Sequence, residues 1–217
     1  MNVYAEYFIE NNLSFRTNTI LQFGDNWELI GNIVLANPGS AEPLREINDN
    51  ERDKLTLFYK KYRNRIGDKF NQKNWYKFTD DQTMRFVEKI FNGSYLNISK
   101  NLNGVIQLFN TFNIKNQYLT EAINQINIDS NILFSKGIEK YFHDKPTYFG
   151  FSNEVLNNKI LRDVAKDIFD NSSEKIKNIY NSDFSKNSFY HPMYINRAFK
   201  QNHFQWYKYN VLKSLIS

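Results

Sequence analysis

Three polar residues, Asn37, Asn110 and His191, are the side chains of this 217-residue chain whose types and positions best suit chemistry. Each follows a short apolar or aromatic segment that has the length of a β-strand. The exits of parallel strands lie along one edge of a sheet, and ligands bind at that edge. Amides donate and accept hydrogen bonds, and imidazole exchanges protons near neutral pH. We therefore expect these residues to converge in one ligand pocket.

The first of these segments gives the clearest change from strand to loop. Residues 33–36 are Ile-Val-Leu-Ala, and they lead directly into Asn-Pro-Gly-Ser at 37–40. A run that is apolar at every position suits a strand covered on both faces, as in a parallel sheet. The rigid proline and the permissive glycine would then fix the loop that carries Asn37.

The rest of the pattern predicts the elements that position this loop. Alternating residues over 13–36, punctuated at Gly24-Asp25-Asn26, predict a β-hairpin that leads into the central strand. Further strands are expected at 105–109, 146–151 and 189–190. Apolar stripes and capping residues also predict helices. In chain order these cover residues 50–66, residues 79–91, a segment that begins at 120, a segment from 129 or 130 to 142, a segment from 152 or 153 to 168, residues 173–180 and residues 197–215.

This order of elements predicts an α/β fold. We expect a single domain over residues 1–217, arranged as a three-layer α/β/α structure. Its sheet would be short, four-stranded and mostly parallel, with an N-terminal β-hairpin.

Composition excludes several classes of site. The chain has no cysteine, which excludes disulfides, cysteine-ligated zinc and iron–sulfur clusters. With only three histidines we expect no metal site, and with no phosphate-binding glycine loop or nucleophilic triad we expect no cofactor. No apolar run approaches the length of a membrane span, and the first residues lack a signal-peptide layout, so we expect a cytoplasmic protein without membrane contact.

Positive charge is concentrated in two segments. Residues 51–77 hold nine basic and three acidic residues, and residues 171–217 hold seven basic and two acidic residues, in a chain of net charge +5. This distribution permits a polyanionic partner such as DNA, contacted by Lys60, Lys61, Arg63, Arg197 and Lys200. The alternative is that both segments are simply solvated faces.

Three segments resemble motifs of the uracil-DNA glycosylase superfamily. Residues 36–42, Ala-Asn-Pro-Gly-Ser-Ala-Glu, resemble its first motif, and residues 191–194, His-Pro-Met-Tyr, resemble its second. Residues 108–111, Leu-Phe-Asn-Thr, are similar to the strand that supplies a base-reading asparagine. The order and spacing match over roughly residues 30–200. The likeness is greatest to an uncharacterised bacterial branch whose first motif is Asn-Pro-Ser-Thr-Ala and whose second is His-Pro-Leu-Tyr.

The resemblance implies roles for these residues. Asn37 would position the attacking water or contact the base, and His191 would stabilise the departing base anion. Asn110 would bind the edge of a base that has been extruded from nucleic acid. The further base contacts implied are Pro38, Gly39 and a stacking wall drawn from Phe109, Phe112 and Phe151.

The chain also departs from the superfamily. The most active members carry an aspartate in the first motif, where this chain offers Asn37 and, further along, Glu42. An amide cannot act as a general base. The uncharacterised branch would align its asparagine with Gln107 rather than Asn110. The alternatives to a glycosylase are a non-catalytic sensor of a free nucleobase or nucleotide and an accessory protein of a mobile element.

Overall fold

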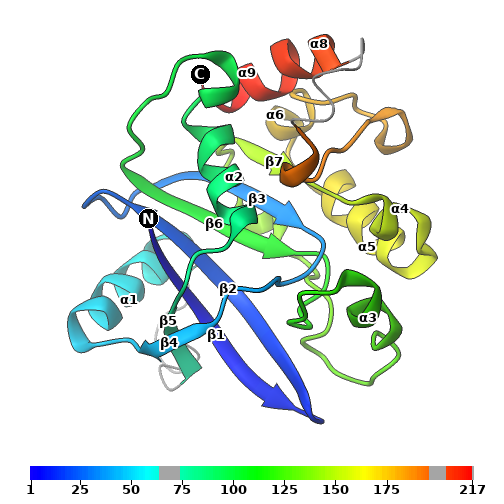
Figure 1. Cartoon of the computed structure of the whole chain (residues 1–217). Helices are drawn as coiled ribbons and strands as arrows, with labels where there is room; N and C mark the ends of the chain where they lie inside the picture. The colour runs from blue at the N-terminus through cyan, green and yellow to red at the C-terminus, as the bar shows by residue number, and fades with distance from the viewer. Residues whose placement is uncertain (64–73, 196–203, 217) are drawn as a thin grey trace.

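A seven-stranded mixed sheet forms the centre of the protein (Figure 1). The computed structural model describes residues 1–63, 74–195 and 204–216. The strands are β1 (Asn2–Glu10), β2 (Leu13–Phe23), β3 (Leu29–Leu35), β4 (Pro43–Glu46), β5 (Trp75–Phe78), β6 (Gly104–Asn110) and β7 (Thr147–Phe149). Their order across the sheet is β4-β5-β1-β2-β6-β3-β7.

The expected short, mostly parallel, four-stranded sheet is therefore wrong, although the α/β class is confirmed. Only β3 pairs in parallel, with β6 on one side and β7 on the other. The pairs β1·β2, β1·β5, β2·β6 and β4·β5 are all antiparallel. Strong apolar runs predicted the parallel part, whereas β1, β4 and β5 lie in the antiparallel part and include residues that are only partly buried or exposed.

The N-terminal hairpin also differs from the expected one. It joins β1 to β2 through Asn11 and Asn12, whose φ angles of 52° and 60° lie in the left-handed region, as in the two-residue turns that suit twisted hairpins. Residues 13–36 do not form a hairpin, because β6 lies between β2 and β3. The turn after β2 instead crosses the end of β6, where Asn103 Oδ1 accepts hydrogen bonds from the backbone N–H groups of Asp25 and Asn26.

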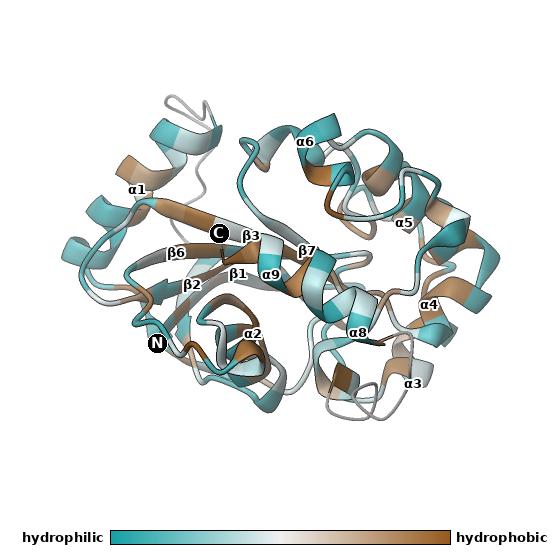
Figure 2. Cartoon of the chain, turned by 90° about the horizontal axis from the view of Figure 1, so that it is seen from above, coloured by the Kyte–Doolittle hydropathy of each residue, from teal (hydrophilic) through white to brown (hydrophobic). Residues whose placement is uncertain are grey.

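Helices cover both faces of the sheet, with α1, α5 and α6 on one side and α2 on the other (Figure 2). The helices are α1 (Asp49–Arg63), α2 (Gln82–Phe91), α3 (Leu119–Asn124), α4 (Asn153–Asn157), α5 (Lys159–Asp170), α6 (Glu174–Lys177), α8 (Phe204–Tyr207) and α9 (Lys213–Leu215). A π-helical turn (Lys208–Leu212) connects α8 to α9. No helix in the described part of the chain is both long and apolar enough to cross a membrane.

Several helix predictions need correction. Residues 129–142 form irregular structure with one short 3-10 turn at Glu139–Tyr141, and residues 189–190 are not in a strand. The helix expected after residue 152 is divided at Asn158, which caps α5 through a bond from Leu161 N. Asp81 rather than Thr79 caps α2. Part of the helix expected over 197–215 falls outside the described residues.

The two faces of the sheet are filled differently. Residues such as Ile33, Leu108 and Tyr148 pack on the α2 side, and all are fully or almost fully buried. On the opposite face, Arg63 donates from Nε and Nη2 to Gln107 Oε1 at 2.9 and 2.8 Å, and Gln107 Nε2 donates to Asn32 Oδ1 at 3.0 Å. This network satisfies the side chains of Asn32 and Gln107, which the centre of the sheet buries on this face.

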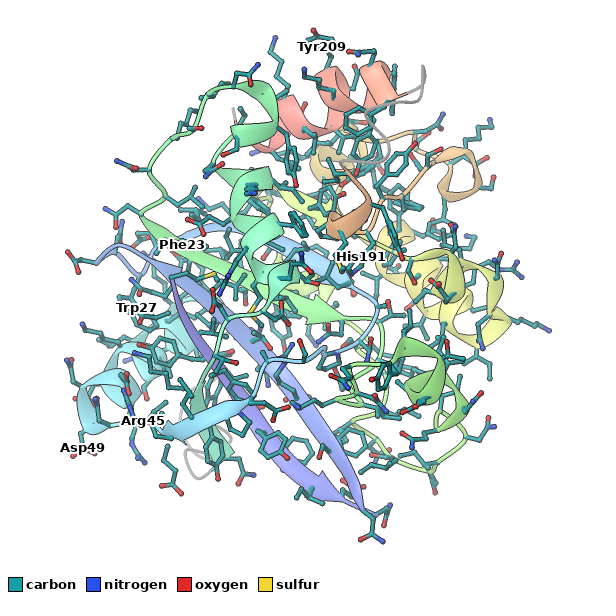
Figure 3. The ribbon with its side chains drawn as sticks, in the orientation of Figure 1. Phe23, Trp27, Arg45, Asp49, His191 and Tyr209 are labelled. Atoms are coloured by element: carbon teal, nitrogen blue, oxygen red, sulfur yellow. The ribbon has the colours of Figure 1, made fainter. Side chains whose placement is uncertain are left out.

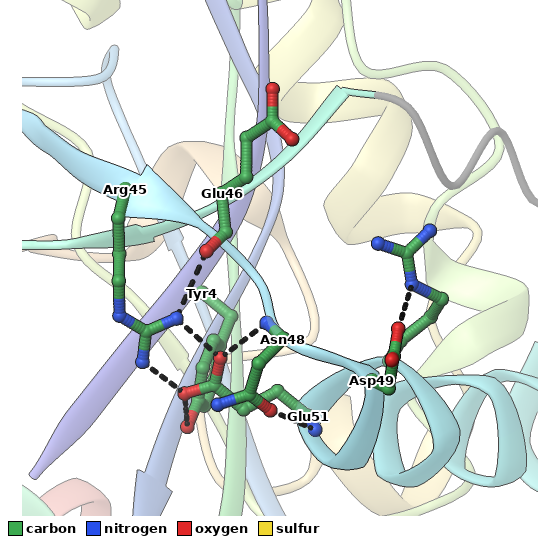
Figure 4. A network of polar contacts seen from close by, with 7 residues as sticks. Tyr4, Arg45, Glu46, Asn48, Asp49 and Glu51 are labelled. Atoms are coloured by element: carbon green, nitrogen blue, oxygen red, sulfur yellow. Dashed lines mark hydrogen bonds and ion pairs between the residues drawn. The ribbon is translucent and has the colours of Figure 1, made fainter.

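A second polar network attaches α1 to the edge of the sheet (Figure 4). Asn48 and Glu51 form a reciprocal capping box, in which each backbone N–H donates to the other side chain at 2.9 Å. Both Glu51 oxygens also accept bonds from the Arg45 guanidinium, at 2.7 and 2.8 Å, and Tyr4 donates to the same carboxylate. This network fixes the start of α1 against β4 and β1.

Candidate active site

A cavity of about 240 Å³ lies on the α2 side of the sheet, at the carboxyl ends of β3 and β6. Asn37, Asn110 and His191 all line it, together with Gly39. Arg16, Asp81, Ser152, Glu154 and Tyr194 are among its other lining residues. The parallel strands β3 and β6 thus bring Asn37 and Asn110 together at one edge of the sheet, as expected. His191 comes from irregular backbone rather than from the exit of the strand expected at 189–190.

Asn37 braces the loop that follows β3. Its Nδ2 donates to three backbone carbonyl oxygens, those of Pro38 at 3.0 Å, Ile114 at 3.2 Å and Asn116 at 2.9 Å. These bonds hold the first loop against the segment that follows β6. The amide nitrogen is thereby occupied, so any contact with a ligand falls to Oδ1.

Asn110 is buried at the end of β6. Its Oδ1 has no hydrogen-bond partner among the described residues. A buried polar atom without a partner costs free energy, unless a ligand satisfies it. Gln107, the alternative base reader, faces away from this cavity and is held by Arg63 and Asn32. The geometry therefore favours Asn110 over Gln107.

His191 precedes a 3-10 turn, Pro192–Tyr194, and lies beside the centre of the molecule in Figure 3. Its Nδ1 accepts a long bond of 3.4 Å from Met193 N, which assigns the proton of the neutral ring to Nε2. Burial lowers the pKa of His191 to about 4, against the opposing effect of Asp81 and Glu154. The imidazole is thus a neutral hydrogen-bond donor at physiological pH.

Arg16, on β2, places a buried cation at the cavity. Its side chain is almost wholly enclosed, with 2% of the residue exposed, and Nε and Nη1 have no hydrogen-bond partner among the described residues. The guanidinium carbon lies 5.6 Å from the centre of the Phe78 ring. Burial lowers the Arg16 pKa to about 10, while Asp81 and Glu42 act in the opposite direction. The residue remains charged at neutral pH without a direct ion pair to a described residue.

Asp81 and Glu154 supply the carboxylates of the cavity. Asp81 Oδ1 caps α2 by accepting a hydrogen bond from Met84 N at 2.9 Å. Asp81 Oδ2 faces Gly39, and a Cβ atom added to Gly39 would lie 3.3 Å from this oxygen. Glu42, the carboxylate nearest to Asn37 in the sequence, is not among the lining residues and pairs with Lys115 at 2.6 Å. A carboxylate next to the first loop is thus provided from a distant part of the chain.

Other residues expected at the site lie elsewhere. Phe109 packs against Phe142 on the opposite face of the sheet, and Phe112 and Phe151 are fully buried in the core. Neither they nor Pro38 line the cavity, where Tyr194 is the aromatic lining residue and is 43% exposed.

The basic residues expected to contact phosphates are not brought to the cavity either. Lys60 and Lys61 are exposed on α1, across the sheet, and Lys61 pairs with Glu28. Arg63 is buried beside Gln107. Arg197 and Lys200 lie outside the described residues.

Sequence reasoning missed Arg16, Asp81, Glu154 and Tyr194. Tyr194 lies within the His-Pro motif, so the motif could have indicated it. The pattern Asp80-Asp81-Gln82 indicated a helix cap but not a residue of the cavity. Nothing in the local sequence of β2 sets Arg16 apart from other strand residues. No group of three or more His, Asp or Glu side chains within residues 1–63, 74–195 and 204–216 is arranged to hold a metal ion.

Comparisons of the chain with protein-family models, with curated proteins and with solved structures found no match. The chemistry of the cavity is therefore what indicates function.

Proposed function

We propose that the cavity binds a nucleobase that has been extruded from nucleic acid, and that the protein hydrolyses its N-glycosidic bond. The observation that carries this proposal is the convergence of Asn37, Asn110 and His191 in one cavity at the exits of β3 and β6. The cavity of about 240 Å³ lies slightly below the range of roughly 300–1,000 Å³ usual for drug-sized ligands, which suits an occupant as small as a single base.

The polar groups of the cavity complement the edge of a base. Asn110 Oδ1 lacks a donor, and the Arg16 guanidinium lacks acceptors. Base edges present N–H donors beside carbonyl oxygens or ring nitrogens. A base with its N–H on Asn110 would therefore satisfy an atom that the folded protein leaves unpaired, and Tyr194 offers an aromatic surface beside it.

The same groups suit hydrolysis. Water attacks the anomeric carbon of the sugar, the bond from that carbon to the base nitrogen breaks, and its electron pair leaves with the base. The proton lost by the water can pass to the departing base, so that the products are the free base and an abasic sugar. His191 Nε2–H would donate to the base as negative charge develops, and the Asp81 carboxylate would orient the water.

Binding without bond cleavage is the second candidate, and the bonding of Asn37 favours it. Because Nδ2 of Asn37 is held by three backbone carbonyls, only Oδ1 remains to contact water or a base. In this case the protein would recognise a modified base or a free nucleotide.

The test is to incubate the full chain with single- and double-stranded DNA that carries uracil, hypoxanthine or a mismatched base, and to measure base release and DNA binding at several salt concentrations. Asp81→Asn keeps a side chain that can cap α2 but removes the negative charge. If the protein is a glycosylase, this variant should bind DNA like the wild type and release base more slowly, by a factor of about 100.

The matched control is Asn157→Ala, since Asn157 is exposed on α4 and does not line the cavity. Binding without release by the wild type would select the second candidate. Both candidate functions would be overturned if the wild type released no base, showed no salt-dependent DNA binding and was not stabilised by free bases or nucleotides in a thermal-shift assay.

A further inference from the structure

We infer that Arg16 determines the charge of the ligand, so that the cavity takes its base preferentially as an anion held against the guanidinium. This inference rests on the proposed function, and it adds the ionisation state of the base that the cavity selects. Arg16 lies on the N-terminal hairpin, outside the three motifs that suggested the site.

The first support is that the Arg16 cation is buried without a hydrogen-bonded anion. Of its side-chain nitrogens, Nε and Nη1 are buried and lack a partner among the described residues. Arg63, the last residue of α1, is the other buried arginine among the described residues. It donates to Gln107 and lies over the rings of Tyr59, Phe109 and Tyr141. The buried guanidinium of Arg63 therefore has protein partners, whereas that of Arg16, which lies at the cavity, has none at Nε and Nη1 among the described residues.

The second support is the arrangement of charge around Arg16. The carboxylates that act on it are Asp81 at the start of α2 and Glu42 in the loop before β4. Asp81 is already compensated by the N-terminus of α2, where Met84 N donates to it, and Glu42 is paired with Lys115. Glu154, the other carboxylate of the cavity, acts on His191. An anionic oxygen of the ligand would thus be the partner that hydrogen-bonds directly to the guanidinium.

The third support is the neutral state of His191. A neutral imidazole can donate one hydrogen bond to a departing base, but it cannot balance a full negative charge. A guanidinium in the same enclosed cavity can, and in a water-poor site the attraction is much stronger than in solution. Bases whose N–H groups ionise easily should therefore bind more tightly than neutral bases of the same shape.

The test uses free pyrimidines of increasing acidity, namely uracil, 5-fluorouracil and 5-nitrouracil, titrated into the full chain by calorimetry at about pH 6 and about pH 9. Cytosine, whose ring N–H ionises only at a much higher pH, is the control ligand. The pKa of His191 lies well below this window and that of Arg16 above it, and carboxyl groups ordinarily titrate below it. Loss of the Arg16 proton at the upper end of the window would lower the affinity for an anion, so a gain in affinity reports ionisation of the ligand.

We expect 5-nitrouracil to bind at least about tenfold more tightly than uracil at the lower pH, and uracil to gain affinity at the higher pH. Arg16→Met should remove both differences, while Arg162→Met, at an exposed position on α5, should leave them unchanged. Should Arg16→Met fail to fold, the acidity series on the wild type still decides the matter.

Equal affinity for neutral and ionised bases, or an unchanged acidity dependence in Arg16→Met, would overturn the role of Arg16 and leave the proposed function intact. If the wild type binds none of these bases at either pH, this inference fails, and base release from DNA decides the proposed function separately.

Discussion

Replacing Arg16 with methionine should stabilise the folded protein, although it removes a residue of the proposed site. The fall of the Arg16 pKa from 12.5 to about 10 corresponds to roughly 3 kcal/mol of unfavourable free energy for the buried charge. Below pH 10 the residue is protonated in both the folded and the unfolded chain, so this cost is present in full at pH 7. Methionine fills the volume of the arginine stem, and the contact with Phe78 that it loses contributes about 1 kcal/mol. The net gain should be about 2 kcal/mol.

Arg63→Met is the matched control, because the same substitution at the other buried arginine should have the opposite sign. It removes two hydrogen bonds to Gln107 Oε1 and leaves that buried oxygen without its cationic partner. We expect a loss of about 3 kcal/mol. Urea unfolding of both variants and the wild type at pH 7 measures the two changes. A loss of more than about 1 kcal/mol in Arg16→Met would show that the guanidinium is satisfied within the protein, and the reasoning would be refuted.

Three further changes test the site. Burial lowers the pKa of His191 from 6.5 to about 4, so the unfolded chain takes up more protons in that range, and stability present above pH 6.5 should be lost towards pH 4. Between pH 7 and about pH 4.5 the wild type should therefore lose about 2 kcal/mol more unfolding free energy than His191→Gln does. An equal loss of stability in the two proteins would contradict this prediction. Asn110→Leu removes a buried oxygen without a partner, so the free energy of unfolding should be unchanged or about 1 kcal/mol higher. The affinity for a base, measured by calorimetry, should fall at least about tenfold. A loss of stability with affinity retained would count against a ligand role for Asn110. Gly39→Ala places a methyl group 3.3 Å from Asp81 Oδ2. This variant should bind a base more weakly, with a change in unfolding free energy below about 1 kcal/mol. Unaltered binding would mean that the base lies elsewhere.

The parallel part of the fold could be predicted because its signal is local. Residues of β3, β6 and β7 are buried on both faces, so each strand is a nearly continuous apolar run, and these predictions are confirmed. Once the strands were placed, their exits indicated where polar residues would meet. The convergence of Asn37 and Asn110 followed from that rule, whereas His191 reaches the cavity from irregular backbone where the expected strand does not form.

The elements that were predicted wrongly depend on distant contacts. The helix expected over 129–142 fails because Phe134 pairs with Phe112 in an isolated β-bridge and Gly137 adopts a φ of +68°. The apolar residues of that segment reach the core from irregular backbone, so their helix-like spacing misled. The four antiparallel pairings likewise depend on which strand lies beside which, and sequence periodicity does not encode that choice.

The same limit explains why Arg16 and Asp81 were missed, and why they matter to the chemistry. The three motifs place two amides and a neutral imidazole at the cavity, and none of these carries charge at neutral pH. Arg16 and Asp81 come from the hairpin and from the start of α2, which lie outside those motifs, and the third charged residue, Glu154, comes from α4. Local patterns thus predicted the groups that recognise a ligand. The pair that gives the site its electrostatic character, a buried guanidinium beside a helix-capping carboxylate, arises only from tertiary structure. For this reason substitution of Asp81 should separate binding from bond cleavage, and substitution of Arg16 should change which ionisation state of the base is bound.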